Sequence, residues 1–113
     1  MVPVQMELSI APLRHPGPGI AGASIQERFE AFHQLNPWIL VQLESLTADC
    51  AKRGLRRIGI GMLFEVLRWQ YGRATSGEPF KLNNDFRSRY DRLLVQRHPE
   101  WAALFETREL RTP

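Results

Sequence analysis

Cysteine, long apolar runs and catalytic motifs are scarce or missing in this sequence. The single cysteine, Cys50, excludes an internal disulfide and is typical of a reducing compartment. No stretch approaches the roughly 18 consecutive apolar residues that a membrane-spanning helix requires. The beginning of the chain has an acidic residue, Glu7, and lacks the basic segment that opens a secretory signal peptide. We therefore expect a cytoplasmic protein without a membrane partner.

Motifs for catalysis or metal binding are equally scarce. There is no phosphate-binding loop and no serine-hydrolase motif, and the three histidines have no metal-ligand spacing among themselves or with the cysteine. Glu65 is the one acid on a mostly apolar segment. It is interpreted as an ion-pair partner of Arg68 or Arg57, with the general base of a hydrolase as the lesser alternative. The sequence thus predicts no enzyme activity, no metal and no cofactor.

What the chain does have is an uneven distribution of charge. Residues 52–97 contain eleven basic and four acidic side chains, which gives this segment a net charge of +7. The rest of the chain has four basic and eight acidic side chains, so its net charge is −4 and that of the whole chain is +3. A basic middle segment can attract phosphates or an acidic protein surface.

Apolar residues recur at helical spacing in five segments. These segments predict helices at about 25–35, 37–53, 62–73, 83–97 and 99–107. A capping box of Ser24 and Glu27 marks the first start, and the pair Asn36-Pro37 marks the second, with Asn36 as its N-cap. The expected fold class is all-α, a compact bundle of about five short helices.

The order of these helices resembles a helix-turn-helix core, in which a long helix, a turn and a central helix precede a basic helix. The connection at 58–60 leaves room for a minimal two-stranded wing. We expect one domain over residues 24–110, preceded by a flexible Pro- and Gly-rich arm at 1–23 and followed by a frayed tail at 111–113.

The helix at 83–97 is the main candidate for a functional surface. On a helical wheel, its polar side chains point away from the apolar stripe, and they are of the types that hydrogen-bond base edges and phosphates. Four would meet a groove of double-stranded DNA while three basic side chains outside the helix hold the backbone. The predicted nucleic-acid contacts are Asn84, Arg87, Ser88 and Arg92 in the groove, and Arg56, Arg57 and Lys81 on the backbone.

Each of these assignments has a structural alternative. Asp85 and Asp91 would repel a phosphate backbone and are interpreted as ion-pair partners of Arg89 and Arg87, which leaves a solvated or protein-facing helix as an alternative. The basic cluster at 52–57 lies at the end of a predicted helix, where its first members would also stabilise the helix dipole.

Aromatic side chains offer candidates for a protein interface. Trp69 and Trp101 fall on apolar faces and are expected in the core. Trp38 lies off the apolar stripe of its helix, so it either packs against the first helix or is an exposed anchor for a protein partner. Arg89, on the shoulder of the basic helix, is the second interface candidate.

Several stretches carry a resemblance to a known family. MLFEVLRW, KLNN, SRY and FETREL, within residues 24–110, are similar to segments of a family of small uncharacterised proteins from bacteriophages and bacterial prophages. The resemblance implies a mobile-element gene, whose small products are often transcriptional regulators or inhibitors of host systems. The sequence therefore predicts a phage-type DNA-binding regulator. The alternative is an inhibitor or adaptor that acts on a host nucleic-acid-processing or defence protein.

Overall fold

The computed structural model describes residues 10–20, 22–75 and 82–105. Four α-helices and three short 3-10 turns make up the regular structure of these residues. In chain order they are η1 (Pro18–Ile20), α2 (Ile25–Leu35), α3 (Pro37–Lys52), α4 (Ile60–Ala74), η2 (Asn84–Phe86), α5 (Arg87–Arg97) and η3 (Pro99–Trp101). The expected all-α class is confirmed.

The helix boundaries follow from local signals in the sequence. Ser24 Oγ accepts a hydrogen bond from the Glu27 amide at 3.1 Å, and the Glu27 carboxylate accepts one from the Ser24 amide at 3.1 Å, so the predicted capping box forms. After α3, Gly54 has a φ of +85°, a left-handed conformation that a side chain disfavours. α5 ends before the His98-Pro99 pair, as expected of a residue that precedes proline.

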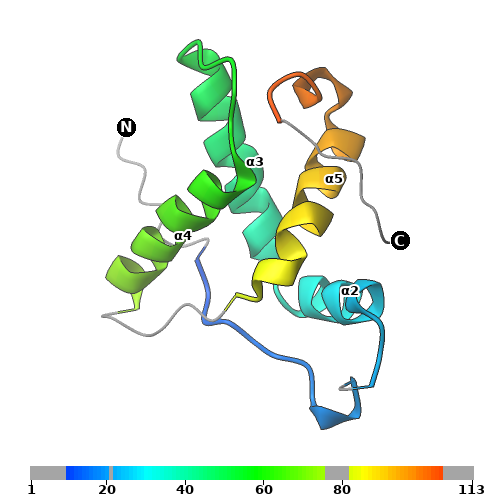
Figure 1. Ribbon diagram of the computed structural model, residues 1–113. Coiled ribbons are helices and arrows are strands. Elements are labelled where there is room, and N and C mark those ends of the chain that lie inside the picture. Colours follow the sequence, from blue (N-terminus) through cyan, green and yellow to red (C-terminus); the bar gives the residue numbers. More distant parts are fainter. Residues whose placement is uncertain (1–9, 21, 76–81, 106–113) are drawn as a thin grey trace.

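The core lies where the four helices meet. Figure 1 shows α3 and α5 side by side, with α4 crossing in front of α3 and α2 across the lower end of α5. Each helix contributes apolar side chains with at most 4% of their surface exposed, at roughly 1.5–3 kcal/mol of favourable transfer each. They are Phe29, Phe32, Ile39, Leu43, Leu63, Phe64, Leu67, Tyr71, Tyr90 and Leu94.

Asn36 does not cap α3 with its side chain, contrary to expectation. Its fully buried amide instead donates to the backbone oxygens of Arg14 at 2.7 Å and Phe32 at 2.9 Å, and accepts from the Arg14 amide at 2.9 Å. Nearby, the Leu13 amide donates to the Tyr71 hydroxyl at 3.0 Å. Residues 13 and 14, in the segment expected to be a flexible arm, are therefore docked on the helical core.

The predicted fifth helix at 99–107 was wrong for its described part. Only Pro99–Trp101 forms a 3-10 turn, and Phe105 then forms an isolated parallel bridge with Ile58. The Ile58 amide donates to the Leu104 oxygen at 2.8 Å, so the chain leaves the helical path to reach this partner. Within the described ranges, the structure has this single β-bridge in place of the expected two-stranded wing.

Trp69 was wrongly placed in the core by the helical wheel. α4 buries Leu63, Phe64, Leu67 and Tyr71, whereas Trp69 on the opposite side is 62% exposed. The helix is therefore covered on one side and not on several, and Met62 and Trp69 are exposed.

Candidate nucleic-acid interface

The basic helix is held in place by its apolar stripe and by a local cap. Asn83 Oδ1 accepts a hydrogen bond from the Asp85 amide at 2.9 Å, which starts η2 directly before α5. Phe86, Tyr90 and Leu94 are then buried against the other helices. This arrangement leaves the opposite side of α5 facing outward, as the sequence predicted.

The four side chains predicted to meet a groove do not all lie on that outward side. Asn84 and Arg92 are exposed, and Ser88 is half-buried between them. Arg87 is also half-buried because it turns toward α4, where its guanidinium carbon lies 5.7 Å from the centre of the Phe64 ring. The prediction that Arg87 points away from the bundle was wrong.

Arg87 can lie this close to α4 because Gly61 has no side chain. A Cβ placed on Gly61, near the start of α4, would lie 3.4 Å from Arg87 Nη1, so the guanidinium approaches the helix backbone closely. Gly59, the N-cap of α4, offers no side-chain cap, and the positive end of the helix dipole lies at this end. Arg87 thus adds a formal positive charge beside the start of α4.

The basic connection between α3 and α4 ends at the start of α4, beside Arg87. Arg56 and Arg57 are exposed, and Arg57 precedes Gly61 by four residues, which limits the separation of their Cα atoms to about 15 Å. The fold therefore brings this connection near the start of α5. Lys81, the third predicted backbone contact, lies outside the described residues. We call Arg56, Arg57, Asn84, Arg87, Ser88 and Arg92 the basic surface.

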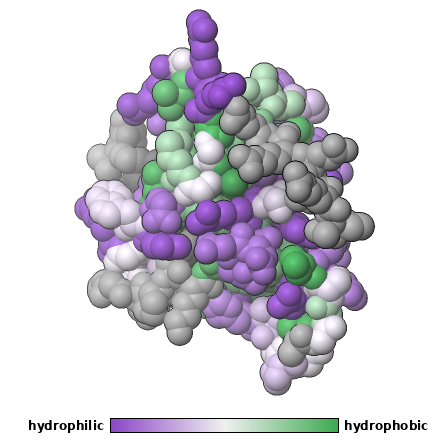
Figure 2. Space-filling model, in the orientation of Figure 1, coloured by the Kyte–Doolittle hydropathy of each residue, from purple (hydrophilic) through white to green (hydrophobic). Residues whose placement is uncertain are grey.

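Figure 2 shows hydrophilic side chains in a band across the region where α4 and the start of α5 lie in Figure 1. The acids Asp85 of η2 and Asp91 of α5 were expected to pair with arginines of this region. Neither Asp85 nor Asp91 forms an ion pair with a described residue, so the predicted pairs with Arg89 and Arg87 are wrong. Burial raises the pKa of Asp91 to about 6.

Buried polar atoms without hydrogen-bond partners gather in this part of α5. Within the described part of the chain they include Arg87 Nε, Tyr90 Oη and Asp91 Oδ1. Burial also raises the pKa of the Tyr90 hydroxyl. Each buried polar group left without a partner costs about 1–3 kcal/mol, so their concentration in one helical turn calls for an explanation.

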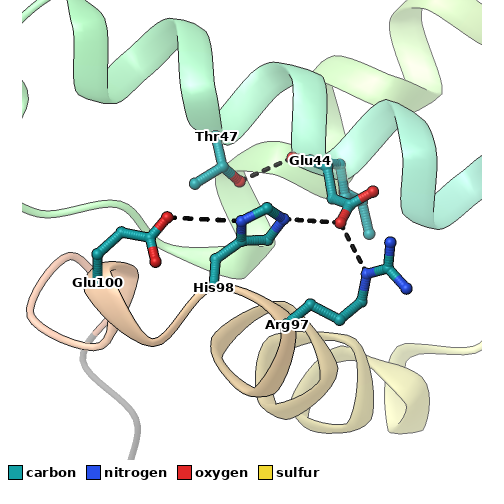
Figure 3. A network of polar contacts seen from close by, with 6 residues as sticks. Glu44, Thr47, Arg97, His98 and Glu100 are labelled. Carbon is teal, nitrogen blue, oxygen red and sulfur yellow. Dashed lines mark hydrogen bonds and ion pairs between the residues drawn. The ribbon is translucent and has the colours of Figure 1, made fainter.

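The other end of α5 carries a polar network that the sequence did not reveal (Figure 3). Glu44 Oε2 of α3 accepts a hydrogen bond from Arg97 Nε at 2.8 Å and lies 2.8 Å from His98 Nε2. His98 Nδ1 lies 3.5 Å from Glu100, and its ring stacks on Trp101 at 4.0 Å between centroids. Partial burial raises the pKa of Glu44, but the contacts with Arg97 and His98 outweigh it and hold this pKa below its usual value.

Two further predictions concern single side chains. Glu65 pairs with Arg68 at 3.5 Å, which confirms the structural interpretation of this acid. Trp38 is half-buried and stacks on Tyr71 of α4 with 6.1 Å between ring centres, an arrangement that neither alternative named. Arg89, the other interface candidate, is half-buried, with Nη1 3.4 Å from the Ser88 hydroxyl.

Other kinds of site find little support among the described residues. No three His, Cys, Asp or Glu side chains there are placed to hold a metal ion, and no helix there is long and apolar enough to cross a membrane. A small open cavity of about 140 Å³ beside η2 is below the roughly 300 Å³ of typical ligand pockets. Its lining includes Arg28, Phe32 and Asn83.

Comparisons with protein-family models, with curated proteins and with solved structures found no match to this chain. The resemblance to small phage proteins therefore stays an expectation from the sequence. The functional conclusion rests on the side chains of the basic surface.

Proposed function

We propose that the protein is a small DNA-binding protein, a transcriptional regulator of the phage type, that contacts double-stranded DNA through its basic surface. The observation that carries this proposal is the half-buried Arg87, whose guanidinium lies beside the start of α4, where no side chain caps the helix. Together they would stabilise one anion through a guanidinium and a helix amino end. A backbone phosphate of DNA is such an anion.

The outward side of α5 supports contacts with base edges. Ser88 and Arg92 are one helical turn apart, and the exposed Asn84 precedes them by another four residues. α5 has 11 residues and is thus about 16 Å long, and the major groove, roughly 12 Å wide, admits an α-helix. Arginine recognises guanine with two hydrogen bonds, and asparagine recognises adenine in the same way. Arg56 and Arg57 would then bind phosphates beside the groove.

The test is fluorescence-anisotropy binding to a random duplex of about 30 base pairs across a salt series. The logarithm of the binding constant falls linearly with the logarithm of the salt concentration, and each phosphate contact makes this slope steeper by about 0.9. We expect Arg87→Ala/Arg92→Ala to weaken binding by an order of magnitude or more and to lower the slope by about 1, because Arg87 is the phosphate contact of the pair. Arg92→Glu is a second variant, since Arg92 is exposed and its replacement leaves the packing of α5 intact.

The matched control is Arg14→Ala/Arg53→Ala, which also removes two positive charges. Both side chains are exposed, and neither belongs to the basic surface. Equal weakening by the control and test pairs would show a general charge effect and contradict the proposal. So would negligible binding of the wild type at low salt.

A second candidate function is a protein inhibitor or adaptor that docks on a host nucleic-acid-processing or defence protein. The observation in its favour is that Asp85 and Asp91 lie among the arginines of α5 and form no ion pair with a described residue. A protein surface of mixed charge would pair with both signs, whereas a phosphate backbone repels the acids. Under this alternative, DNA binding is weak, and one host protein co-purifies with the wild type but not with Arg92→Glu.

A further inference from the structure

α4 carries an exposed apolar strip on the side opposite the core. Trp69 has 62% of its surface exposed, the largest fraction among the large apolar side chains of the described residues, and Met62 has 44%. Seven residues separate them, which places both on one face, and the half-buried Val66 lies between them. Tryptophan is the residue type most typical of protein-interface hot spots, so this strip has the composition of a binding surface.

Charged side chains border Trp69 in a symmetric way. Glu65 precedes it by four residues and Arg73 follows it by four, so the three form one row along the helix. The Arg73 guanidinium carbon lies 4.9 Å from the centre of the Trp69 ring, within cation–π distance. The row thus has a negative charge toward the start of α4, an aromatic ring in the middle and a positive charge toward the end.

We propose that this strip binds a second copy of the same chain, with the two α4 helices packed antiparallel about a two-fold axis at Trp69. A two-fold axis there places Glu65 of each copy opposite Arg73 of the other, because both lie four residues, or about 6 Å, from the centre. The charge pattern of the strip is therefore complementary to itself.

The expected dimer is weak. α4 has 15 residues and is about 22 Å long, so one helix pair buries less area than the roughly 1,200 Å² of standard stable interfaces. Interfaces of this size are typically weak or transient, so we expect dimers only at micromolar or higher concentrations of the protein. The dimer does not depend on the proposed DNA binding, because the row on α4 is separate from the basic surface.

The first test is sedimentation equilibrium of the full chain without DNA, at concentrations from about 1 to 100 µM. We expect the wild type to dimerise and Trp69→Ala to weaken the dimer at least about thirtyfold, the effect of a hot-spot residue. Leu55→Ala is the matched control, because Leu55 is 45% exposed, as Met62 is, but lies before α4. A wild type that stays monomeric throughout, or a dimer that Trp69→Ala leaves unchanged, would overturn the proposal.

The second test exchanges the charges. Glu65→Arg and Arg73→Glu should each be monomeric where the wild type dimerises, since each places like charges together. An equimolar mixture of the two variants should dimerise, because both cross-pairs are then complementary, and circular dichroism confirms that each variant is folded. Failure of the mixture to dimerise would overturn the antiparallel arrangement. A monomeric wild type whose strip captures another protein would assign the strip to that partner instead.

Discussion

The two ends of α5 are built differently. At its C-terminal end, Arg97 and His98 contact Glu44 of α3, and the ring of His98 stacks on Trp101. In its first turns, polar atoms of Arg87 and Asp91 are buried without hydrogen-bond partners among the described residues. One end of the helix is thus tied to the bundle by polar contacts, whereas the other end contains buried polar atoms without such contacts among the described residues. Each such group costs free energy, so this end of the helix contributes less to stability than the anchored end.

The largest effect on stability should come from breaking the anchored end. Glu44→Ala removes the acceptor of Arg97 and the contact of His98, so we expect a loss of about 2 kcal/mol in the free energy of unfolding at pH 7. Urea unfolding measures it. Glu44→Gln, which keeps an acceptor without the charge, should lose about half as much. Equal stability of Glu44→Ala and wild type would contradict the anchoring role.

A smaller effect of opposite sign is expected at the other end. The pKa of Asp91 is raised from 3.8 to about 6 in the folded protein, so the folded state binds more protons than the unfolded chain between these values. Stability from this group is therefore present below about pH 4 and falls as the pH rises to about 6. Asp91→Asn should stabilise the protein at pH 7 by about 1–2 kcal/mol, after allowance for solvent screening.

Urea unfolding of wild type and Asp91→Asn at pH 4 and pH 7 checks this prediction. The stabilisation should be present at pH 7 and much smaller at pH 4, where the folded-state carboxyl is protonated and the unfolded-state carboxyl is near the midpoint of its titration. A gain that is the same at both pH values would point to a cause other than the titration of Asp91.

The smallest effect on stability is expected from removing the hydroxyl of either of two buried tyrosines, Tyr90 and Tyr71. The Tyr90 hydroxyl has no partner in the described part of the chain, so Tyr90→Phe should leave stability unchanged or raise it by up to about 1 kcal/mol. Tyr71→Phe removes the acceptor of the Leu13 amide and should cost about 1 kcal/mol. Thermal unfolding of both variants measures the difference. A larger loss for Tyr90→Phe than for Tyr71→Phe would reverse the comparison.

Local signals in the sequence predicted most of the fold. The capping box at Ser24, the glycine after α3 and the His98-Pro99 pair all act over a few residues, and the helices begin and end near the expected positions. The apolar stripe of α5 was also predicted, since three of its members are nearly fully buried. These features depend on short-range physics that the sequence displays directly.

The candidate site was predicted less well because it depends on which elements become neighbours. A helical wheel placed Arg87 outward, but Gly61 of α4 lets its guanidinium approach that helix. The wheel also placed Trp69 in the core, although no described element covers it. Glu44 and His98 are 54 residues apart, and no local sequence pattern around either residue predicts that they are in contact. Periodicity identifies a face, whereas its partner is decided by tertiary packing.

The amide of Asn36 has a practical consequence for shortening the chain. This fully enclosed side chain exchanges hydrogen bonds with the backbone of Arg14, a residue that composition alone would assign to a dispensable leader. Removing everything before Ser24 would leave the buried Asn36 amide without its two hydrogen bonds to the Arg14 backbone. A shortened chain for crystallisation or NMR should therefore begin upstream of Leu13, so that Leu13 and Arg14 keep their hydrogen bonds with Tyr71 and Asn36.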